Sequence, residues 1–352
     1  MDKRIMIMAG GTGGHVFPAL AVAENLRAQG WTVSWLGTEK GLENRVVPAH
    51  NIEIDYLSVA GLRGKGFFTK LKSMFLVFKA CLQARNYLRT RKPNVVLGMG
   101  GFVAGPGGLM AKVLGIPLVI HEQNRVVGTT NRLLARMANQ ALEAFPNSFP
   151  AKQKAICTGN PLRKDFLLLP EKMFWDKAVR PLHILVVGGS QGAQILNETV
   201  PQAIAELENI QVKHQTGEAM FDIVNSAYQH LNVSAEVLKF IEDMPAAYQW
   251  ADLLICRSGA MTVSEVAAAG LPAIFVPLPN AIDDHQTANA RYLTDENAGI
   301  MMLQKELTAQ QLASAIKQNL NELNGMGKAA KNKARLDATE MVCACCITEA
   351  KA

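Results

Sequence analysis

The chain has 352 residues, 49% of them hydrophobic, and a formal net charge of +6. A single hydrophobic core rarely grows beyond about 250–300 residues, so this length predicts two domains. Nine Lys or Arg and no acidic residue lie between Arg63 and Lys92, and subtracting these nine charges from +6 leaves −3 for the rest. The basicity is therefore one local patch, which argues against a nucleic-acid-binding protein.

Composition also bears on the compartment. No segment approaches the roughly 20 apolar residues of a membrane span, and the opening residues lack the pattern of a signal peptide. Six cysteines show no disulfide framework, so we expect a cytoplasmic protein with reduced thiols. Cys343, Cys345 and Cys346 have no neighbouring His or second Cys pair, and we expect free thiols on a terminal helix rather than a metal site.

The first apolar run leads into a glycine-rich loop. Ile5–Met8 is continuously apolar, as expected for a strand buried on both faces of a parallel sheet. The loop 10–14 follows, and we expect a helix beginning near Pro18. A strand, a glycine turn and a helix N-terminus form a typical anion site, because the backbone amides can approach a ligand closely. His15 adds a titratable side chain at the mouth of this helix.

Strands and helices alternate through the first half. Further strands are expected at Thr32–Leu36, Ile52–Leu57, Asn94–Leu97 and Pro117–Ile120. This alternation is typical of right-handed βαβ units and predicts a parallel sheet. A second glycine loop, 98–108, follows the fourth strand, and His121–Asn124 follows the fifth.

The same plan restarts after a linker with a short helix at Gly159–Pro181. A buried strand at Ile184–Val187 leads into GGSQG and a helix from Ala193. Ala251–Pro277 then repeats the strand, glycine loop, helix and strand of 94–120. We therefore expect an α/β protein with two Rossmann-like domains facing a cleft. The expected boundaries are 1–160 for the N-terminal domain, 161–335 for the C-terminal domain and 336–352 for a helical tail that packs back on the first half.

The second half carries its own candidate phosphate site. Arg257–Thr262 opens a helix whose N-terminal amides and hydroxyls suit a pyrophosphate. We place Glu265 in the first turn of that helix, where its carboxylate can accept hydrogen bonds from two ribose hydroxyls. The alternative is a structural Glu stabilised by the helix dipole.

A polar cluster follows the next strand. Asp283 and Asp284 could hold a metal, but helix amides can supply the counter-charge that a sugar diphosphate needs, and we expect no metal. Gln286 and Asn289 present paired donors and acceptors that suit sugar hydroxyls.

Eight motifs occur in one order between about Ile5 and Asn289: GGTGGHVFPALAVA, GLRGKG, VVLGMGGFVAGPGG, HEQN, GNPLR, VVGGSQGAQILN, CRSGAMTVSEVAAAGLPAIFVP and DDHQTANA. Together they resemble the MurG family of bacterial cell-wall glycosyltransferases. The resemblance implies a GT-B fold and metal-independent transfer of GlcNAc without a cofactor. The donor would be UDP-GlcNAc and the acceptor the 4-hydroxyl of MurNAc in undecaprenyl-pyrophosphoryl-MurNAc-pentapeptide, with inversion. It also implies a peripheral protein at the cytoplasmic face of the inner membrane.

The resemblance assigns binding residues position by position. Those implied for UDP-GlcNAc are Thr12, Gly13, Gly14, Asn124, Arg163, Ser190, Ile241, Ala260, Met261, Thr262, Val263, Ser264, Glu265, Gln286 and Asn289. Within this set Ser190 would lie near the phosphates, the Ile241 backbone would bind uracil and Glu265 the ribose. The residues expected on the acceptor side, facing the lipid's pyrophosphate, are Gly11, Gly100, Gly101 and Gly105.

Inverting transfer needs a base for the acceptor hydroxyl and counter-charge for the departing UDP. His15 is the candidate base, because an unperturbed histidine has a pKa of about 6.5. Glu122 is the reserve, either as base or as the group that orients the acceptor or the imidazole. The alternative for His15 is a helix-capping or sheet-facing histidine.

The basic patch contains apolar residues at helical spacing. The residues expected at a membrane surface are Lys65, Phe67, Phe68, Lys70, Leu71, Lys72, Phe75 and Phe78. A core-facing helix with a solvated basic side is the common alternative. The absence of acids and a lipid-linked substrate favour an interfacial helix on anionic lipid.

Two other classes of protein remain open at this point. A UDP-GlcNAc 2-epimerase would share the two-domain architecture and act on UDP-GlcNAc alone. A non-catalytic sensor would bind the nucleotide sugar and convert nothing.

Overall fold

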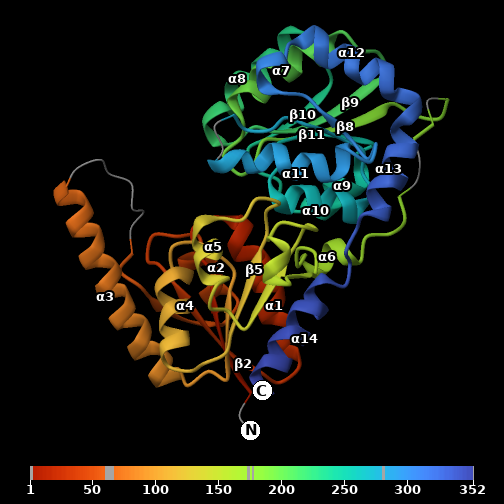
Figure 1. Cartoon of the computed structure of the whole chain (residues 1–352). Helices are drawn as coiled ribbons and strands as arrows, with labels where there is room; N and C mark the ends of the chain where they lie inside the picture. The colour runs from red at the N-terminus through yellow and green to blue at the C-terminus, as the bar shows by residue number, and fades with distance from the viewer. Residues whose placement is uncertain (1–2, 60–66, 173–174, 177, 280–281, 352) are drawn as a thin grey trace. The chain divides into compact units, whose positions relative to one another are not determined.

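The computed structural model describes residues 3–59, 67–172, 175–176, 178–279 and 282–351, with only the backbone described for 67–74 and 282. The chain divides into two compact units (Figure 1). The first unit comprises Met1–Arg163 and Arg335–Ala352, and the second Lys164–Ala334.

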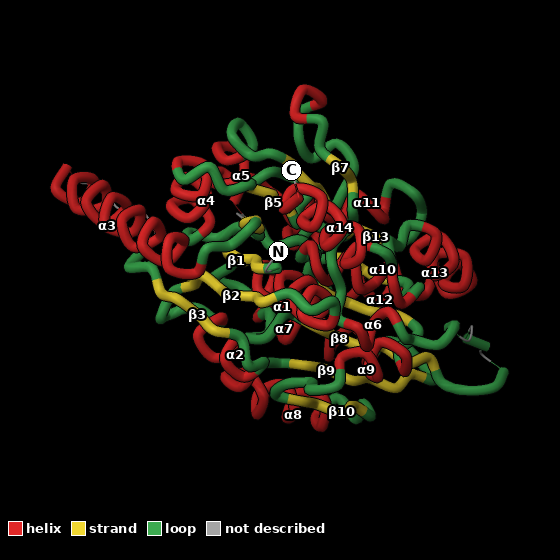
Figure 2. Tube along the Cα trace, turned by 90° about the horizontal axis from the view of Figure 1, so that it is seen from below, coloured by secondary structure: helices red, strands yellow, loops and turns green. Residues whose placement is uncertain are grey.

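The described strands of the first unit form one parallel sheet in the order β3-β2-β1-β4-β5-β6-β7. Its strands are β1 Arg4–Met8, β2 Thr32–Gly37, β3 Glu53–Tyr56, β4 Val95–Gly98, β5 Leu118–Glu122, β6 Gln140–Glu143 and β7 Ile156–Cys157. Its α-helices are α1 Gly13–Ala28, α2 Glu43–Ala49, α3 Phe67–Arg91, α4 Ala104–Val113, α5 Thr129–Leu134 and α14 Ala338–Lys351. A short 3₁₀ helix, η1, spans Ala151–Gln153. In Figure 2, β1, β2 and β3 lie side by side.

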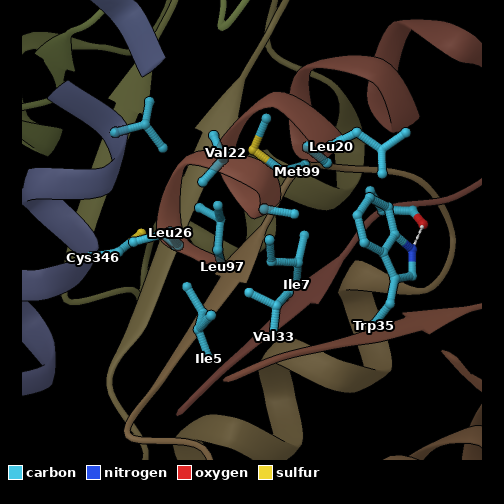
Figure 3. Close-up of a cluster of buried hydrophobic side chains, with 14 of the residues drawn as sticks. Ile5, Ile7, Leu20, Val22, Leu26, Val33, Trp35, Leu97, Met99 and Cys346 are labelled. Atoms are coloured by element: carbon cyan, nitrogen blue, oxygen red, sulfur yellow. Dashed lines mark hydrogen bonds between the residues drawn. The ribbon is translucent and has the colours of Figure 1, made fainter. Parts of the chain in front are cut away.

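Strand β1 is buried on both faces, as its continuous apolar run predicts. Ile5 and Ile7 join a core cluster with residues of α1 and α14, including Leu26 and Cys346 (Figure 3). Met6 and Met8 join a second cluster on the opposite face of the sheet, with residues of α3 and α4. The sheet is therefore covered by helices on both sides.

The last helix, α14, belongs to the first unit and packs against α1. The Cys343 thiol donates a weak hydrogen bond to the Val22 carbonyl at 3.8 Å, and Cys346 is fully buried. Burial raises the pKa of Cys343 to about 12, so this thiol is a packing group rather than a nucleophile.

The described strands of the second unit form a parallel sheet in the order β10-β9-β8-β11-β12-β13. Its strands are β8 Leu182–Val187, β9 Ile210–Gln215, β10 Ala235–Leu238, β11 Leu253–Cys256, β12 Ala273–Phe275 and β13 Ile300–Met301. Its α-helices are α6 Lys164–Leu167, α7 Gln194–Ala205, α8 Phe221–His230, α9 Met244–Trp250, α10 Ala260–Ala269, α11 His285–Thr294, α12 Ala309–Asn319 and α13 Leu323–Asn332. Short 3₁₀ helices are η2 Glu218–Met220, η3 Ile282–Asp284, η4 Gln304–Glu306 and η5 Leu320–Glu322.

The two sheets repeat one topology. Strands β3-β2-β1-β4-β5 correspond in order to β10-β9-β8-β11-β12. In each sheet the order reverses beside the first strand, which is where open α/β sheets bind ligands. The predicted pair of Rossmann-like domains is confirmed.

Two helix positions differ from the expectation. Helix α1 begins at Gly13 rather than near Pro18, because Thr12 has the extended backbone of an N-cap and Pro18 is accommodated within the helix. His15 therefore lies in the first helical turn. Helix α10 begins at Ala260, so Glu265 lies in its second turn rather than its first.

No helix in the described part of the chain is both long and apolar enough to cross a membrane.

Candidate functional site

The glycine loop after β1 is hydrogen-bonded to a buried carboxylate. Glu43, at the start of α2, is completely buried. Its Oε2 accepts the Gly11 N–H at 2.9 Å, and its Oε1 accepts the Thr38 N–H and hydroxyl at 2.8 and 2.7 Å. A Cβ at Gly10 would lie 2.6 Å from Glu43 Oε1, so a side chain does not fit there. The Gly11 amide is therefore already bound within the protein.

The imidazole of His15 lies between the two glycine loops of this unit. A Cβ at Gly100, where φ is +97°, would lie 2.9 Å from both Cε1 and Nδ1 of His15. A Cβ at Gly101 would lie 2.5 Å from the Gly10 carbonyl oxygen. These two glycines are required because the loops after β1 and β4 approach each other closely around the ring.

A buried hydrogen-bonded chain leads away from His15. Its Nδ1 lies 3.0 Å from Gln123 Oε1, and Gln123 Nε2 lies 3.2 Å from His121 Nδ1. His121 Nε2 lies 2.9 Å from the carbonyl oxygen of Gly159. Burial lowers the pKa of His121 to about 4, so this imidazole is neutral at pH 7.

Glu122 has a structural position. It is 2% exposed, and its Oε1 accepts hydrogen bonds from the backbone and side-chain nitrogens of Asn124 at 3.0 and 3.2 Å. Its Oε2 accepts from the Gly128 N–H at 3.0 Å and from Asn131 Nδ2 at 2.9 Å. These four bonds shape the turn into α5. The group bonded to the His15 imidazole is Gln123, the residue after Glu122.

The remaining predicted residues of the first unit occupy distinct positions. Thr12 precedes α1, and Gly13 packs against Phe17, whose ring a Cβ would approach to 2.8 Å. A Cβ at Gly14 would meet only Thr12 Oγ1, at 3.7 Å, so that face of the helix start is open. The Arg163 guanidinium lies 5.8 Å from the Phe17 ring centroid. Gly105 is the second residue of α4, and a Cβ there would lie 3.7 Å from the Thr130 methyl group of α5.

The glycine loop after β8 is held by a neutral amide. Gln215, the last residue of β9, donates from Nε2 to the Gly189 carbonyl at 2.8 Å. Its Oε1 accepts the Ile241 N–H, also at 2.8 Å. The two backbone segments predicted to bind nucleotide, at Gly189–Ser190 and at Ile241, are thus joined by one side chain. Because the Ile241 N–H is taken, only its carbonyl is left to face a base.

A hollow of about 560 Å³ opens in this unit. It is lined by Gly188, Gly192, Ala193, Gln194, Ile195, Glu198, Arg257, Leu278, Gln286 and Gln304. Arg257 is the cation of this lining, and its Nη1 donates to the carbonyls of Val276 and Pro277 at 3.0 and 3.2 Å. Gln286 Oε1 accepts the Leu278 N–H at 2.9 Å, which leaves its Nε2 as the donor group.

The start of α10 presents backbone groups more than side chains. Val263 is fully buried, and the Ser264 hydroxyl donates to the Ala260 carbonyl at 3.0 Å. Ala260, Met261 and Thr262 form the first turn, and the half-buried Glu265 follows in the second.

Asn289 and Ser258 are buried beneath the same loop. Asn289 is completely buried and donates from Nδ2 to the Ser258 carbonyl at 3.3 Å. It supports the loop from inside, and its predicted contact with a sugar stays a prediction. The Ser258 hydroxyl is also buried and has no hydrogen-bond partner among the described residues.

The acidic pair near α11 is not part of a cluster. Among the residues that the structure describes, no three His, Cys, Asp or Glu side chains come together as metal ligands. Asp284 Oδ1 accepts from the Thr287 hydroxyl at 2.7 Å.

Helix α3 carries two apolar stripes. Ala80, Ala84 and Leu88 are buried against the sheet, whereas Phe75 and Phe78 are 67% and 61% exposed. A core-facing role for these two aromatic side chains is therefore excluded. Lys65 lies outside the described residues, and the side chains of Phe67, Phe68, Lys70, Leu71 and Lys72 are not described.

Exposed apolar side chains also occur beyond Phe78 on α3 and on its neighbour α4. Leu82 on α3 is 52% exposed, and α3 packs beside α4, whose Val113 is 64% exposed (Figure 1). Lys79 and Arg85 are exposed on the same helix. We call Phe75, Phe78, Lys79 and Leu82 the α3 face.

Three side chains that hold loops within the two units were not in the predicted set: Glu43, Gln123 and Gln215. None has the glycine or charge pattern that marks a ligand site. Gln123 and Gln215 do share one signal, since each is a polar residue at the carboxyl end of a buried parallel strand. The signal for Glu43 is weaker: it is an acidic residue that follows soon after β2.

Comparisons with known proteins agree with this arrangement. Residues 5–143 match the glycosyltransferase family 28 N-terminal domain, and residues 183–342 match the corresponding C-terminal domain. A UDP-N-acetylglucosamine–N-acetylmuramyl-(pentapeptide) pyrophosphoryl-undecaprenol N-acetylglucosamine transferase from Methylococcus capsulatus is 57% identical over 100% of both chains. The crystal structure of Acinetobacter baumannii MurG has 44% identity and a TM-score of 0.84, covering 98% of this chain and 99% of that one.

The UDP-GlcNAc 2-epimerase from Neisseria meningitidis shares the fold alone. It has 13% identity and a TM-score of 0.66, with coverage of 97% of this chain and 98% of the epimerase. Two parallel sheets of this topology define a GT-B-type fold, as in the structure at 44% identity. Within that class, the chain belongs to glycosyltransferase family 28.

Proposed function

We infer that this protein transfers GlcNAc from UDP-GlcNAc to the 4-hydroxyl of MurNAc in undecaprenyl-pyrophosphoryl-MurNAc-pentapeptide, with inversion, during peptidoglycan synthesis. The observation that carries this inference is the 57% identity, over both full chains, to a transferase named for this reaction. A 2-epimerase activity has only a shared fold in its favour.

The base proposed for the acceptor hydroxyl is His15. Its Nδ1 is held by Gln123, so Nε2 is the ring nitrogen left for the substrate. Glu122 is the weaker candidate, because both of its oxygens already accept hydrogen bonds from a buried turn. A positioned base of this kind contributes about 10²–10⁴-fold to a rate.

The nucleotide is proposed to bind the second unit. The N-terminal amides of α10 and the Arg257 guanidinium supply positive charge for the pyrophosphate. Ser190 lies on the neighbouring glycine loop, and the Ile241 carbonyl can accept the imide N–H of uracil. Glu265 is proposed for the ribose hydroxyls and Gln286 Nε2 for the sugar.

The two units are proposed to divide the substrates. The N-terminal domain, 1–160, would take the lipid-linked acceptor, and the C-terminal domain, 161–335, the nucleotide sugar. The tail, 336–352, completes the core of the first unit through α14.

Membrane association is proposed to occur at the α3 face. Exposed aromatic side chains beside exposed cations are typical of a helix that lies in the interface of an anionic bilayer. A protein bound there would be peripheral, on the leaflet that presents its lipid-linked substrate. The cytoplasmic leaflet is the one rich in anionic lipid.

The reaction is tested by incubating the protein with UDP-GlcNAc, with and without a lipid-linked MurNAc-peptide acceptor. We expect UDP release and a GlcNAc-containing lipid product only when the acceptor is present. Formation of UDP-ManNAc without acceptor would identify an epimerase. Binding of UDP-GlcNAc with no conversion under either condition would identify a sensor.

A further inference from the structure

The hydrogen-bonded chain behind His15 ends at a group that can only accept. The carbonyl of Gly159 lies 2.9 Å from His121 Nε2, so this nitrogen must carry the hydrogen and donate it. His121 is completely buried and neutral at pH 7, and a neutral imidazole carries one N–H. Its Nδ1 therefore presents a lone pair.

The orientation of the Gln123 amide follows from that lone pair. The amide nitrogen is the donor end, and it must face His121 Nδ1, at 3.2 Å. The same nitrogen is also near two other acceptors, the His121 carbonyl at 3.4 Å and Met99 Sδ at 4.0 Å. Gln123 is 1% exposed, so water does not offer its amide an alternative.

The carboxamide oxygen is then directed at His15. Gln123 Oε1 lies 3.0 Å from His15 Nδ1, and an oxygen acceptor requires Nδ1 to carry the hydrogen. In the neutral ring the lone pair is consequently on Nε2. A backbone carbonyl that is 38 residues from His121 in sequence thus decides, through two side chains, which nitrogen of His15 is basic.

We propose that Gln123 and His121 are positioning residues that fix His15 in its Nδ1–H tautomer, with Nε2 as the proton acceptor. The role in catalysis rests on the proposed function, whereas the tautomer itself does not. In the reaction the acceptor O–H bond breaks and an Nε2–H bond forms. An electron pair of the acceptor oxygen forms the bond to the anomeric carbon. UDP leaves with the electron pair of the broken glycosyl–phosphate bond.

The hydrogen-bonded chain behind His15 orients the imidazole ring but does not conduct the proton. A carboxamide has no basic site at neutral pH, so the proton taken by Nε2 cannot pass on through Gln123. It must leave by Nε2 after transfer. This is the arrangement by which a second group holds a catalytic histidine in one tautomer without being protonated itself.

The tautomer can be measured without any activity. In protein labelled with ¹⁵N-histidine, long-range ¹H–¹⁵N correlation spectra distinguish protonated from unprotonated ring nitrogens, and His15→Gln assigns the signal among the seven histidines. In the neutral ring of His15 we expect Nδ1 to carry the hydrogen and Nε2 to carry none. In His121 we expect Nε2 to carry the hydrogen and Nδ1 to carry none. A His15 ring with Nε2 protonated overturns the proposal.

Two substitutions separate orientation from packing. Gln123→Met keeps the size but removes the acceptor, and we expect the Nδ1–H tautomer to give way to a mixture. Gln123→Glu keeps an acceptor oxygen, and we expect the Nδ1–H tautomer to persist. The control is Gln140→Met on the adjacent strand β6, which removes an unrelated bond to the Ala141 carbonyl and should change neither. Persistence of the pure tautomer in Gln123→Met contradicts the proposal.

Kinetics then link the tautomer to catalysis. We expect Gln123→Met to lower kcat by about 10-fold or more with an unchanged KM for UDP-GlcNAc, and Gln123→Glu to retain more activity. A wild-type protein with the expected tautomer but no transfer to the lipid acceptor would reject the proposed function and leave the assignment standing. If neither variant folds, the wild-type spectrum alone decides the tautomer.

Discussion

The glycine loops after β1 and β8 share a left-handed glycine but differ in length and in surroundings, since α1 begins at Gly13 and α7 only at Gln194. Gly11 and Gly189 occupy equivalent positions after β1 and β8, with φ of +95° and +98°. The first loop is held by the carboxylate of Glu43 and the second by the carboxamide of Gln215. Counted from these glycines, Ala193 corresponds in sequence to His15, but His15 lies in the first turn of α1, whereas Ala193 is the N-cap of α7.

This difference bears on the proposal that the two strand–loop–helix motifs have different roles. A buried carboxylate 2.9 Å from the Gly11 amide opposes the anion affinity that a helix N-terminus otherwise provides. The neutral Gln215 places no charge on the second loop, and the hollow beside it is lined by both Arg257 and Glu198. These contacts support the proposals that the nucleotide binds the second unit and that the first loop positions His15.

The largest effect is expected from removing the side chain that only the first loop carries. His15→Ala should lower kcat by about 10³-fold with little change in the KM for UDP-GlcNAc, because a base acts in the transition state. The measurement is steady-state kinetics with a soluble acceptor analogue. His50→Ala, at an exposed histidine of the same unit, is the control. Wild-type kcat in His15→Ala would reject the assignment.

The second expected effect concerns membrane contact, which we assign to the first unit alone. Lys79→Glu reverses one exposed charge on the α3 face and should weaken binding to anionic vesicles by about 30-fold, at about 1 kcal/mol per charge. Co-sedimentation measures this, and rising salt should weaken the wild type. Lys317→Glu makes the same charge change on the second unit and should have little effect. Salt-insensitive binding would argue against the α3 face.

A smaller effect should distinguish the supports of the two loops. Gln215→Met leaves the Gly189 carbonyl and the Ile241 N–H without their partner, which should weaken UDP binding by about 10-fold. Titration calorimetry with UDP measures it. Gln211→Met, at the exposed beginning of the same strand, is the matched control. Unchanged affinity would mean that the loop does not need this side chain.

The smallest effect on nucleotide binding is expected at Glu43. Glu43→Gln places an amide N–H₂ group opposite a backbone N–H, so that two donors face each other. This should lower the free energy of unfolding by about 1–3 kcal/mol and the Tm of the first unit by several degrees. UDP affinity should remain that of the wild type. A loss of UDP affinity without a change in Tm would contradict the division between the loops.

The sequence predicted the fold well because its signals are local. Continuous apolar runs identified the central strands, and the repeated strand–glycine–helix plan predicted both sheets. The start of α1 was misplaced because Gly13 and Gly14 are poor helix formers, so Thr12 was not recognised as the N-cap. An error of one turn at Glu265 has a similar origin, since no capping side chain marks the start of α10.

The site was predicted less completely than the fold. Family motifs placed His15 and the loops, but the partner of an imidazole depends on contacts between distant residues. Gln123 is 108 residues from His15, and no periodicity connects them. Glu122 was preferred to its neighbour because a carboxylate can act as a base, and only the structure shows that its oxygens are occupied.

The position of α14 has a consequence for biosynthesis. The chain leaves the first unit at Arg163 and returns at Arg335, and α14 supplies Val342 and Cys346 to the core beside β1. The core beside β1 therefore contains residues that are synthesised after the whole of the second unit, whereas the second unit is continuous in sequence.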